Sequence, residues 1–242
     1  MKSVVLVGVA VGVGVAVLCA STLCAAQMLG PGKKSWESQQ WSPYTVAEFG
    51  PGVLALPTSD FLLTQSDTRT KGEMVPYFWA WMLYRMTNAV AVGAGVSLAV
   101  PFSKETTQRT DSIVRSHKRQ YLLFDVTGRY YAFQWPEVDG WLGATLGGAV
   151  ISDRFNTEAH TTDAVIMGPG GVVVRTEGLS AGLTAGTGWH LSENWTLEAS
   201  ARFSWWFLTS HRACGTTGEC ATLAEGVAAF SVGLGAGYRI SL

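Results

Sequence analysis

Five charged residues stand singly in stretches of the chain that are otherwise small or apolar. They are Arg85, Asp125, Arg129, Glu198 and Arg202. A charged side chain that leaves water for a low-dielectric interior is costly unless an opposite charge pairs with it. Three arginines and two carboxylates could form such pairs. The chemistry open to them is a gate or selectivity cluster for passing solutes, or a fixed ion-pair network that fills an interior.

Two cysteines and three histidines are the remaining candidates for reactive or metal-binding chemistry. Cys214 and Cys220 lie in a polar segment rich in glycine and threonine. In an exported chain we expect them to form a disulfide that closes a small surface loop, with a pair of free thiols as the alternative. Their spacing does not fit a zinc knuckle. His117, His160 and His211 fall in expected loops without an evident spacing of nucleophile and base, so we expect no catalytic residue, metal site or cofactor.

The last thirteen residues, Phe230 to Leu242, show the kind of element that must carry the five charges. Apolar residues there alternate with small or polar ones, and the side chains of a strand point alternately to opposite faces. The pattern predicts a strand with one apolar face and one small or polar face. A strand of this kind at the end of the chain is typical of a membrane barrel that closes on its final strand.

The same alternation predicts eight strands in all. Most exceed the ~5–6 residues typical of soluble strands and reach the ~9–11 residues that cross a bilayer at a tilt. Short connections at 87–88, 134–140 and 192–194 alternate with long polar ones at 57–74, 103–118, 153–171 and 211–226. Tight periplasmic turns and longer outer loops are the plan of an all-β, antiparallel, up-and-down transmembrane barrel. The expected strands are Val46–Leu56, Val75–Met86, Ala89–Phe102, Arg119–Phe133, Trp141–Ser152, Val172–Leu191, Trp195–Ser210 and Val227–Leu242.

Residues 1–26 have the plan of a secretory signal peptide. Met1-Lys2 supplies a positive start, an apolar run follows from Val4 to Leu18, and small residues lead to a cleavage point after Ala26. The apolar run is shorter than the ~20 residues of a spanning helix, so a single-pass anchor is the weaker alternative. Residues 27–45 are polar and rich in turn residues, and we expect them to form a periplasmic lead-in to a barrel at 46–242.

The composition agrees with an outer-membrane barrel. Charged residues make up only 14% of the chain, and there are 28 glycines and ten tryptophans. The net charge of −1 gives no reason to expect a nucleic-acid partner. Trp135, Trp141, Trp189 and Trp195 flank two expected periplasmic turns, where they would form half of an aromatic girdle at the membrane boundary, with scattered core residues as the alternative.

The expected strand faces place the five charges inside the barrel. The face that carries them is otherwise dominated by Gly, Ser and Thr, whereas a soluble ligand-carrying barrel would have its apolar set inside. Eight strands enclose room only for side chains or one small ligand. Trp79 and Trp81 would fill space beside the small Gly93 and Gly95. We therefore favour a fixed ion-pair network in a filled lumen over a gate.

Two stretches carry a resemblance to a known group of proteins. Residues 188–199 combine an aromatic-rich strand, a short Leu-Ser-x-Asn turn and a strand with Glu or Arg inward. In residues 237–242, Gly237 is followed by apolar residues at the third-last and last positions, Ile240 and Leu242. Both stretches resemble the small eight-stranded outer-membrane barrels of the outer-membrane protein A, X, W and opacity types. The resemblance implies that the second stretch is the signal read by the barrel-assembly machinery, although Leu242 stands where Phe or Trp is commonest.

The resemblance implies a non-enzymatic barrel in the outer membrane of a Gram-negative bacterium, with a structural or surface-interaction role. A narrow pore for small or hydrophobic solutes, as in the protein W type, is the alternative. A lipid A-modifying enzyme is the third, because a deacylase of this group uses His-x-Ser and a Glu, and His190, Ser192 and Glu198 match that set. The expected topology puts His190 and Ser192 at a periplasmic turn, far from the outer leaflet.

The expected partners follow from this location. They are outer-membrane lipids and lipopolysaccharide and the barrel-assembly machinery, and we expect a monomer. Phosphates of lipid head groups could bind the basic segment 104–119 in an outer loop, with a simply solvated loop as the alternative. Its cations are Lys104, Arg109, Arg115, Lys118 and Arg119.

Overall fold

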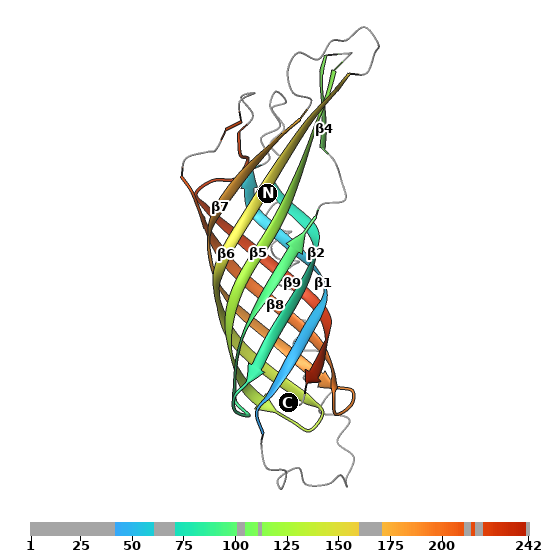
Figure 1. The fold of residues 1–242 in the computed structure, drawn as a ribbon, viewed down its shortest axis with the longest axis vertical. Helices are drawn as coiled ribbons and strands as arrows, with labels where there is room; N and C mark the ends of the chain where they lie inside the picture. The colour runs from blue at the N-terminus through green and yellow to red at the C-terminus, as the bar shows by residue number, and fades with distance from the viewer. Residues whose placement is uncertain are drawn as a thin grey trace.

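Nine antiparallel strands make up the described part of the chain, and eight of them close into a barrel (Figure 1). The computed structural model describes residues 42–60, 71–100, 105–110, 113–159, 171–210, 214–215 and 220–240. Pairing of β9 with β1 and of β3 with β5 closes the ring, while β4 is added to β5 outside it. This confirms the eight-stranded up-and-down barrel expected from the sequence. The strands are β1 (Tyr44–Asp60), β2 (Lys71–Arg85), β3 (Val90–Ala99), β4 (Glu105–Thr110), β5 (Ile113–Gln134), β6 (Val138–Ala159), β7 (Gly171–His190), β8 (Trp195–Leu208) and β9 (Gly226–Ile240).

Two parts of the expected domain plan lie beyond what the structure describes. The signal peptide expected at 1–26 and the lead-in up to residue 41 lie outside the described residues. The end of the expected lead-in, Tyr44 and Thr45, already belongs to β1. Thr45 pairs with Ile240, so the first and last strands meet side by side at one end of the barrel.

The Gly50-Pro51-Gly52 sequence lies inside β1 and does not interrupt it. Pro51 pairs with Phe78 of β2. On the other side, the ladder to β9 passes from Phe49, paired with Ala236, to Gly52, paired with Gly233. Pro51 has no N–H to donate and falls in this gap, which is where a strand tolerates proline.

Two segments expected to be long loops contain strand. The segment 103–118 contains β4 and the start of β5, and β6 continues through Ala159 into the segment 153–171. Strands β5 and β6 are each 22 residues long, about twice the ~9–11 residues needed to cross a bilayer. In Figure 1 they rise with β4 beyond the body of the barrel.

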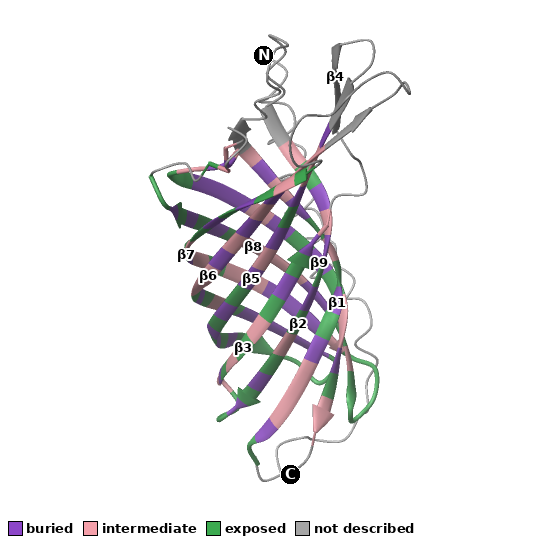
Figure 2. Ribbon diagram, turned by 45° about the horizontal axis from the view of Figure 1, so that its top comes forward, coloured by how far each residue is buried: buried purple, intermediate pink, exposed green. Residues whose placement is uncertain are grey.

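Buried and exposed residues alternate along the strands (Figure 2). Large apolar side chains point outward around the barrel. The apolar side chain of Leu183 on β7, for example, is 67% exposed. Such a belt is suited to contact with lipid rather than with water. Within the described ranges, no helix is long and apolar enough to span a membrane.

The two ends of the barrel differ. The connections at 86–89, 135–137 and 191–194 are short and define what we name the turn end; the longer connections lie at the loop end. Buried side chains in the loop-end half form an apolar cluster, so the expected Gly, Ser and Thr lining describes only the turn-end half. The cluster consists of Leu54, Leu56, Val75, Tyr77, Trp79, Ala99, Tyr121, Leu123, Ala149, Ile151, Trp206, Leu208, Leu223, Val227 and Ala229.

Large rings are accommodated inside the barrel by glycines on neighbouring strands. A Cβ atom at Gly95 would lie 2.4 Å from the Trp81 ring, as expected from the sequence. The ring of Trp79 lies instead against β9, where Cβ atoms at Gly233 and Gly235 would come within 2.5 and 2.6 Å of it. A side chain at these positions would displace the rings that occupy the interior.

Candidate functional site

Arg85, at the turn end of β2, is the centre of the first ion-pair layer in the lumen. Its guanidinium donates hydrogen bonds to the Asp139 carboxylate at 2.7 Å and to the Tyr44 hydroxyl at 2.9 Å. Its Cζ lies 3.7 Å from the centroid of the Tyr131 ring, a cation–π geometry. Arg85 and Asp139 are both buried. The layer therefore connects β1, β2, β5 and β6 across the lumen.

Arg129 on β5 is the centre of a second layer. It donates to both carboxylate oxygens of Glu48 on β1, at 2.9 and 2.8 Å, in the bidentate geometry that makes an ion pair strong and directional. The ring of Trp141 lies 3.9 Å from the guanidinium carbon. All three side chains are buried, and Glu198 is buried beside them as a second carboxylate.

Asp125 and Arg202 form the third pair, between β5 and β8. Arg202 donates to the Asp125 carboxylate at 2.7 Å, and the Ser180 hydroxyl of β7 donates to the other oxygen at 2.6 Å. Asp125 and Ser180 are buried. The carboxylate thus joins three strands on one side of the lumen.

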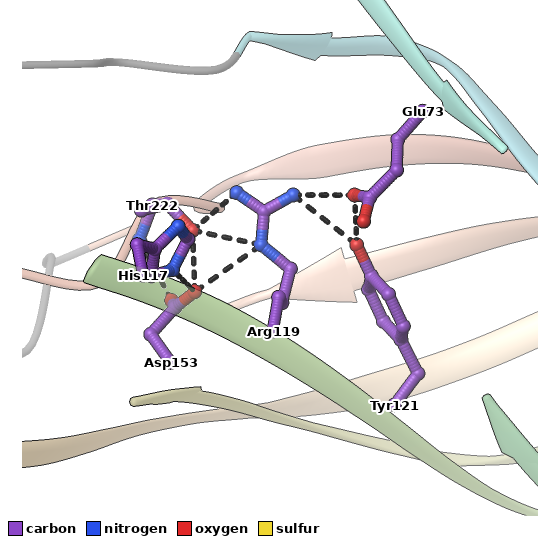
Figure 3. A network of polar contacts seen from close by, with 6 residues as sticks. All are labelled: Glu73, His117, Arg119, Tyr121, Asp153 and Thr222. Carbon is purple, nitrogen blue, oxygen red and sulfur yellow. Dashed lines mark hydrogen bonds and ion pairs between the residues drawn. The ribbon is translucent and has the colours of Figure 1, made fainter. Parts of the chain in front are cut away.

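Arg119, near the loop end of β5, is the centre of the network that Figure 3 shows. Its guanidinium lies 2.7 Å from the Glu73 carboxylate of β2 and 3.2 Å from the Asp153 carboxylate of β6. The Tyr121 hydroxyl donates to Glu73 and accepts from Arg119 at 3.1 Å. Arg119 is only 1% exposed and Asp153 is fully buried, so this pair is deeply withdrawn from water.

The same network binds the segment between β8 and β9 to the mouth of the barrel. Thr222 donates to Asp153 through its backbone N–H at 2.9 Å and through its hydroxyl at 2.7 Å. That hydroxyl also accepts from the guanidinium of Arg119 (Figure 3). Ala221 and Leu223, on either side of Thr222, are buried. Leu223 therefore belongs to the apolar cluster of the loop-end half.

Two small cavities lie between these layers. A cavity of about 40 Å³ lies between the aromatic residues of β2 and the Arg129 and Arg202 layers, and a second of about 50 Å³ lies between Glu48, Glu198 and the turn end. Each has room for roughly three water molecules, since one needs ~10–15 Å³ of such volume. The second cavity is lined by polar groups from β1, β2, β6, β7 and β8.

The structure places the five charged residues predicted from the sequence on the inner face of the barrel. Within that set it brings together Asp125 and Arg202. Arg85 and Arg129 pair instead with Asp139 and Glu48, which sequence reasoning missed. Glu48 could have been found, because it is a lone carboxylate within the predicted strand 46–56; Asp139 stood in an expected turn.

Two residues were assigned to the wrong place. Trp141 does not belong to an aromatic girdle, because it is only 4% exposed and its ring lies under Arg129 in the lumen. Of the girdle residues, Trp135 and Trp195 are exposed. Arg119 is not part of a basic outer loop, because the continued alternation of β5 turns it inward to Glu73 and Asp153.

Of the remaining predicted residues, His160 and His211 lie outside the described residues. His117 lies on β5 rather than in a loop, with Nε2 2.7 Å from Asp153 and its ring stacked on Phe155. Cys214 and Cys220 are joined in a disulfide. Of the predicted assembly signal, Gly237 and Ile240 end β9 at the turn end, whereas Leu242 lies outside the described residues.

The residues that match the deacylase pattern are each engaged separately. His190 Nε2 lies 3.3 Å from Asp139, and its Nδ1 lies 3.4 Å from the Thr196 hydroxyl. The Ser192 hydroxyl accepts from the backbone N–H of Trp195 within the turn between β7 and β8. Glu198 is buried inside the barrel. In the described part of the chain, no group of three or more His, Cys, Asp or Glu residues is arranged to hold a metal ion.

Solved structures show what this architecture is similar to. No family model matches the chain, and no curated protein matches it. Neisserial surface protein A (NspA) superposes with a TM-score of 0.54 at 12% identity, over 83% of this chain and 100% of that one. Ail, the attachment invasion locus protein of Yersinia pestis, solved with the heparin analogue sucrose octasulfate, superposes with a TM-score of 0.50 at 14% identity, over 83% and 100%. The chain therefore has the fold of the small eight-stranded outer-membrane β-barrels.

Proposed function

We propose that this protein is a non-enzymatic barrel of the Gram-negative outer membrane, with a filled lumen and a structural or surface-interaction role. The observation that carries the proposal is the interior of the barrel. Ion pairs cross the turn-end half, an apolar cluster occupies the loop-end half, and the cavities between them are about 40 and 50 Å³. Such an interior stabilises the barrel and leaves no room for a solute larger than water.

The long strands at the loop end support the surface-interaction part of the proposal. Strands β5 and β6 run well past the length that crosses a bilayer, and β4 adds a third strand beside them. A sheet that projects beyond the lipid presents its faces and its edge to the outside of the cell. Names such as surface protein and attachment invasion locus protein, borne by two chains of this fold, agree with such a role.

Planar-bilayer conductance tests the filled lumen. We expect the purified full-length protein to show no steady openings. The variant Glu48→Ala/Arg129→Ala/Trp141→Ala, which removes only the middle layer, should also show no steady openings, because the Arg85 layer and the loop-end apolar cluster remain in place. The outward-facing Phe203→Ala serves as the matched control and should remain closed. Steady openings of the unmodified protein would establish the narrow pore instead.

Lipid A mass spectrometry tests the non-enzymatic part. Deletion and overexpression of the protein should leave the lipid A acyl and phosphate pattern unchanged. A changed pattern that disappears in His190→Ala would establish an enzyme.

Outer-membrane location is tested in the same strains by fractionation and by a gel shift between boiled and unboiled samples. A protein that remains soluble after export would contradict the proposal as a whole.

A further inference from the structure

Three cations lie together on the outer face of the barrel near the loop end. Lys118 of β5 pairs directly with Arg154 of β6, and Arg175 of β7 lies two pairs further along, opposite Ser152. The inward side chains that alternate with them, Arg119, Asp153 and Val174, are buried, so these three point outward. Arg154 and Arg175 are exposed and Lys118 is partly so. We propose that Lys118, Arg154 and Arg175, here named the β5–β7 basic cluster, bind the phosphate groups of anionic lipids in the outer leaflet.

The height of the cluster fits the head-group layer. On the outer face of β5 the residues run Phe124, Leu122, Gln120 and Lys118, so apolar residues give way to polar ones just before the lysine. On β7 the exposed Leu179 follows Arg175 by four residues, toward the turn end. Four residues advance ~13 Å along a strand, or roughly 10 Å along the barrel axis at a ~40° tilt. The head-group region is ~5–8 Å thick on each side, and long cationic side chains reach back toward it.

The repulsion between the like charges on this outer face favours the binding of an anion. Like charges directly opposite each other on adjacent strands, such as Lys118 and Arg154, are destabilising. Among the described residues, no carboxylate forms an ion pair with any member of the cluster. Glu177, two residues from Arg175 on the same face of β7, is the nearest outward carboxylate along that strand. A phosphate bound between the strands would offset the repulsion.

The chemistry of the three side chains selects phosphate. Arginine guanidinium groups bind phosphate oxygens in a bidentate manner, while lysine acts as a compact point charge. A phosphomonoester carries about −1.5 to −2 charges at neutral pH. The basic segment 104–119 was expected from the sequence to bind lipid phosphates, and its residues differ in their relation to the cluster. Lys118 joins two arginines from other strands, whereas Arg119 faces inward.

Native mass spectrometry of the purified full-length barrel in detergent tests this inference, with bisphosphorylated lipid A as the probe. We expect the unmodified protein to retain lipid A. The variant Lys118→Gln/Arg154→Gln/Arg175→Gln should bind it about a hundredfold more weakly, because each cation at an anionic surface contributes about fivefold. Glu177→Gln, on the same face, should bind at least as tightly as the unmodified protein. Equal binding by the unmodified protein and the triple variant would overturn the proposal and leave three solvated charges.

Two further arms separate the outcomes. Inorganic phosphate added at the lipid concentration should not displace lipid A; if it does, the cluster is a site for soluble phosphate and the lipid proposal fails. The inference rests on the proposed membrane location, so each variant is also checked for the gel shift between boiled and unboiled samples. Should the triple variant not fold, each single glutamine variant should still show a several-fold loss of lipid A binding. If the triple variant shows a normal gel shift and unchanged lipid A binding, lipid binding by the β5–β7 basic cluster is disproved. The proposed barrel is unaffected by that result.

Discussion

The bidentate ion pair between Glu48 and Arg129 joins residues that are 81 positions apart in the sequence. Loss of one partner leaves the other charge buried without compensation, which costs about 3–5 kcal/mol. We therefore expect Glu48→Gln to lower the free energy of unfolding by about 3 kcal/mol, measured by urea unfolding in lipid vesicles.

A second substitution distinguishes charge from packing at this pair. The triple variant Glu48→Gln/Arg129→Met/Glu198→Gln should recover stability relative to Glu48→Gln, because the buried carboxylate beside the pair is removed as well and no unpaired charge of this layer remains. Glu177→Gln removes a carboxylate from the exposed outer face, and we expect it to change the unfolding free energy by less than ~0.5 kcal/mol. If Glu48→Gln behaved like Glu177→Gln, the pair would contribute nothing to the fold.

At the residue scale, the sequence predicts which side chains face inward but not which of them meet. Strand alternation turns Arg85, Asp125 and Arg202 inward because the parity of a strand is a local property. The partners of an ion pair come from distant strands, as Arg85 and Asp139 do, and depend on the register around the whole barrel. Trp141 was misplaced for a similar reason: proximity to a turn does not tell which face of its strand a tryptophan occupies.

Thr222, in the connection between β8 and β9, is hydrogen-bonded to Asp153 and Arg119 at the barrel mouth. The variant Thr222→Val removes the hydroxyl that donates to Asp153 and accepts from Arg119. Leaving these buried groups with fewer partners costs about 1–3 kcal/mol. We expect hydrogen exchange of the amides at 220–225 to become roughly tenfold faster or more. Thr222→Ser keeps the hydroxyl and should retain protection; equal exchange in all three proteins would show that burial of Ala221 and Leu223 suffices.

At the element scale, the barrel-wall strands are predictable and their extensions are not. Within the lipid belt one face is apolar and the other small or polar, so β8 and β9 show clear alternation. Beyond the belt the outer face meets water, and polar residues such as Lys118 and Gln120 replace apolar ones there. The two-residue period in hydrophobicity then disappears, although the backbone pairing of β5 with β6 continues.

For the molecule as a whole, the proposed location requires export before the barrel folds in the membrane. We expect the mature protein isolated from outer membranes to begin at Gln27, because small residues lead up to Ala26. Mass spectrometry of the intact mature protein checks this. Replacing Ala26 with a bulky residue, as in Ala26→Leu, should block cleavage and retain residues 1–26. A mature protein that begins at Met1 would favour the single-pass anchor.

The outer apolar belt makes a quantitative prediction about which face of the whole barrel meets lipid. Leu183 lies near the middle of the outer face of β7, whereas Leu191 lies in a connection at the turn end and is 70% exposed. An arginine on the lipid face costs about 2–4 kcal/mol at the bilayer midplane and about 0–1 kcal/mol near the interfaces. Leu183→Arg should therefore destabilise the barrel by about 3 kcal/mol in vesicles, and Leu191→Arg by less than ~1 kcal/mol. Because both leucines are well exposed, a soluble barrel would tolerate the two substitutions equally, and an equal effect would contradict the membrane-spanning belt.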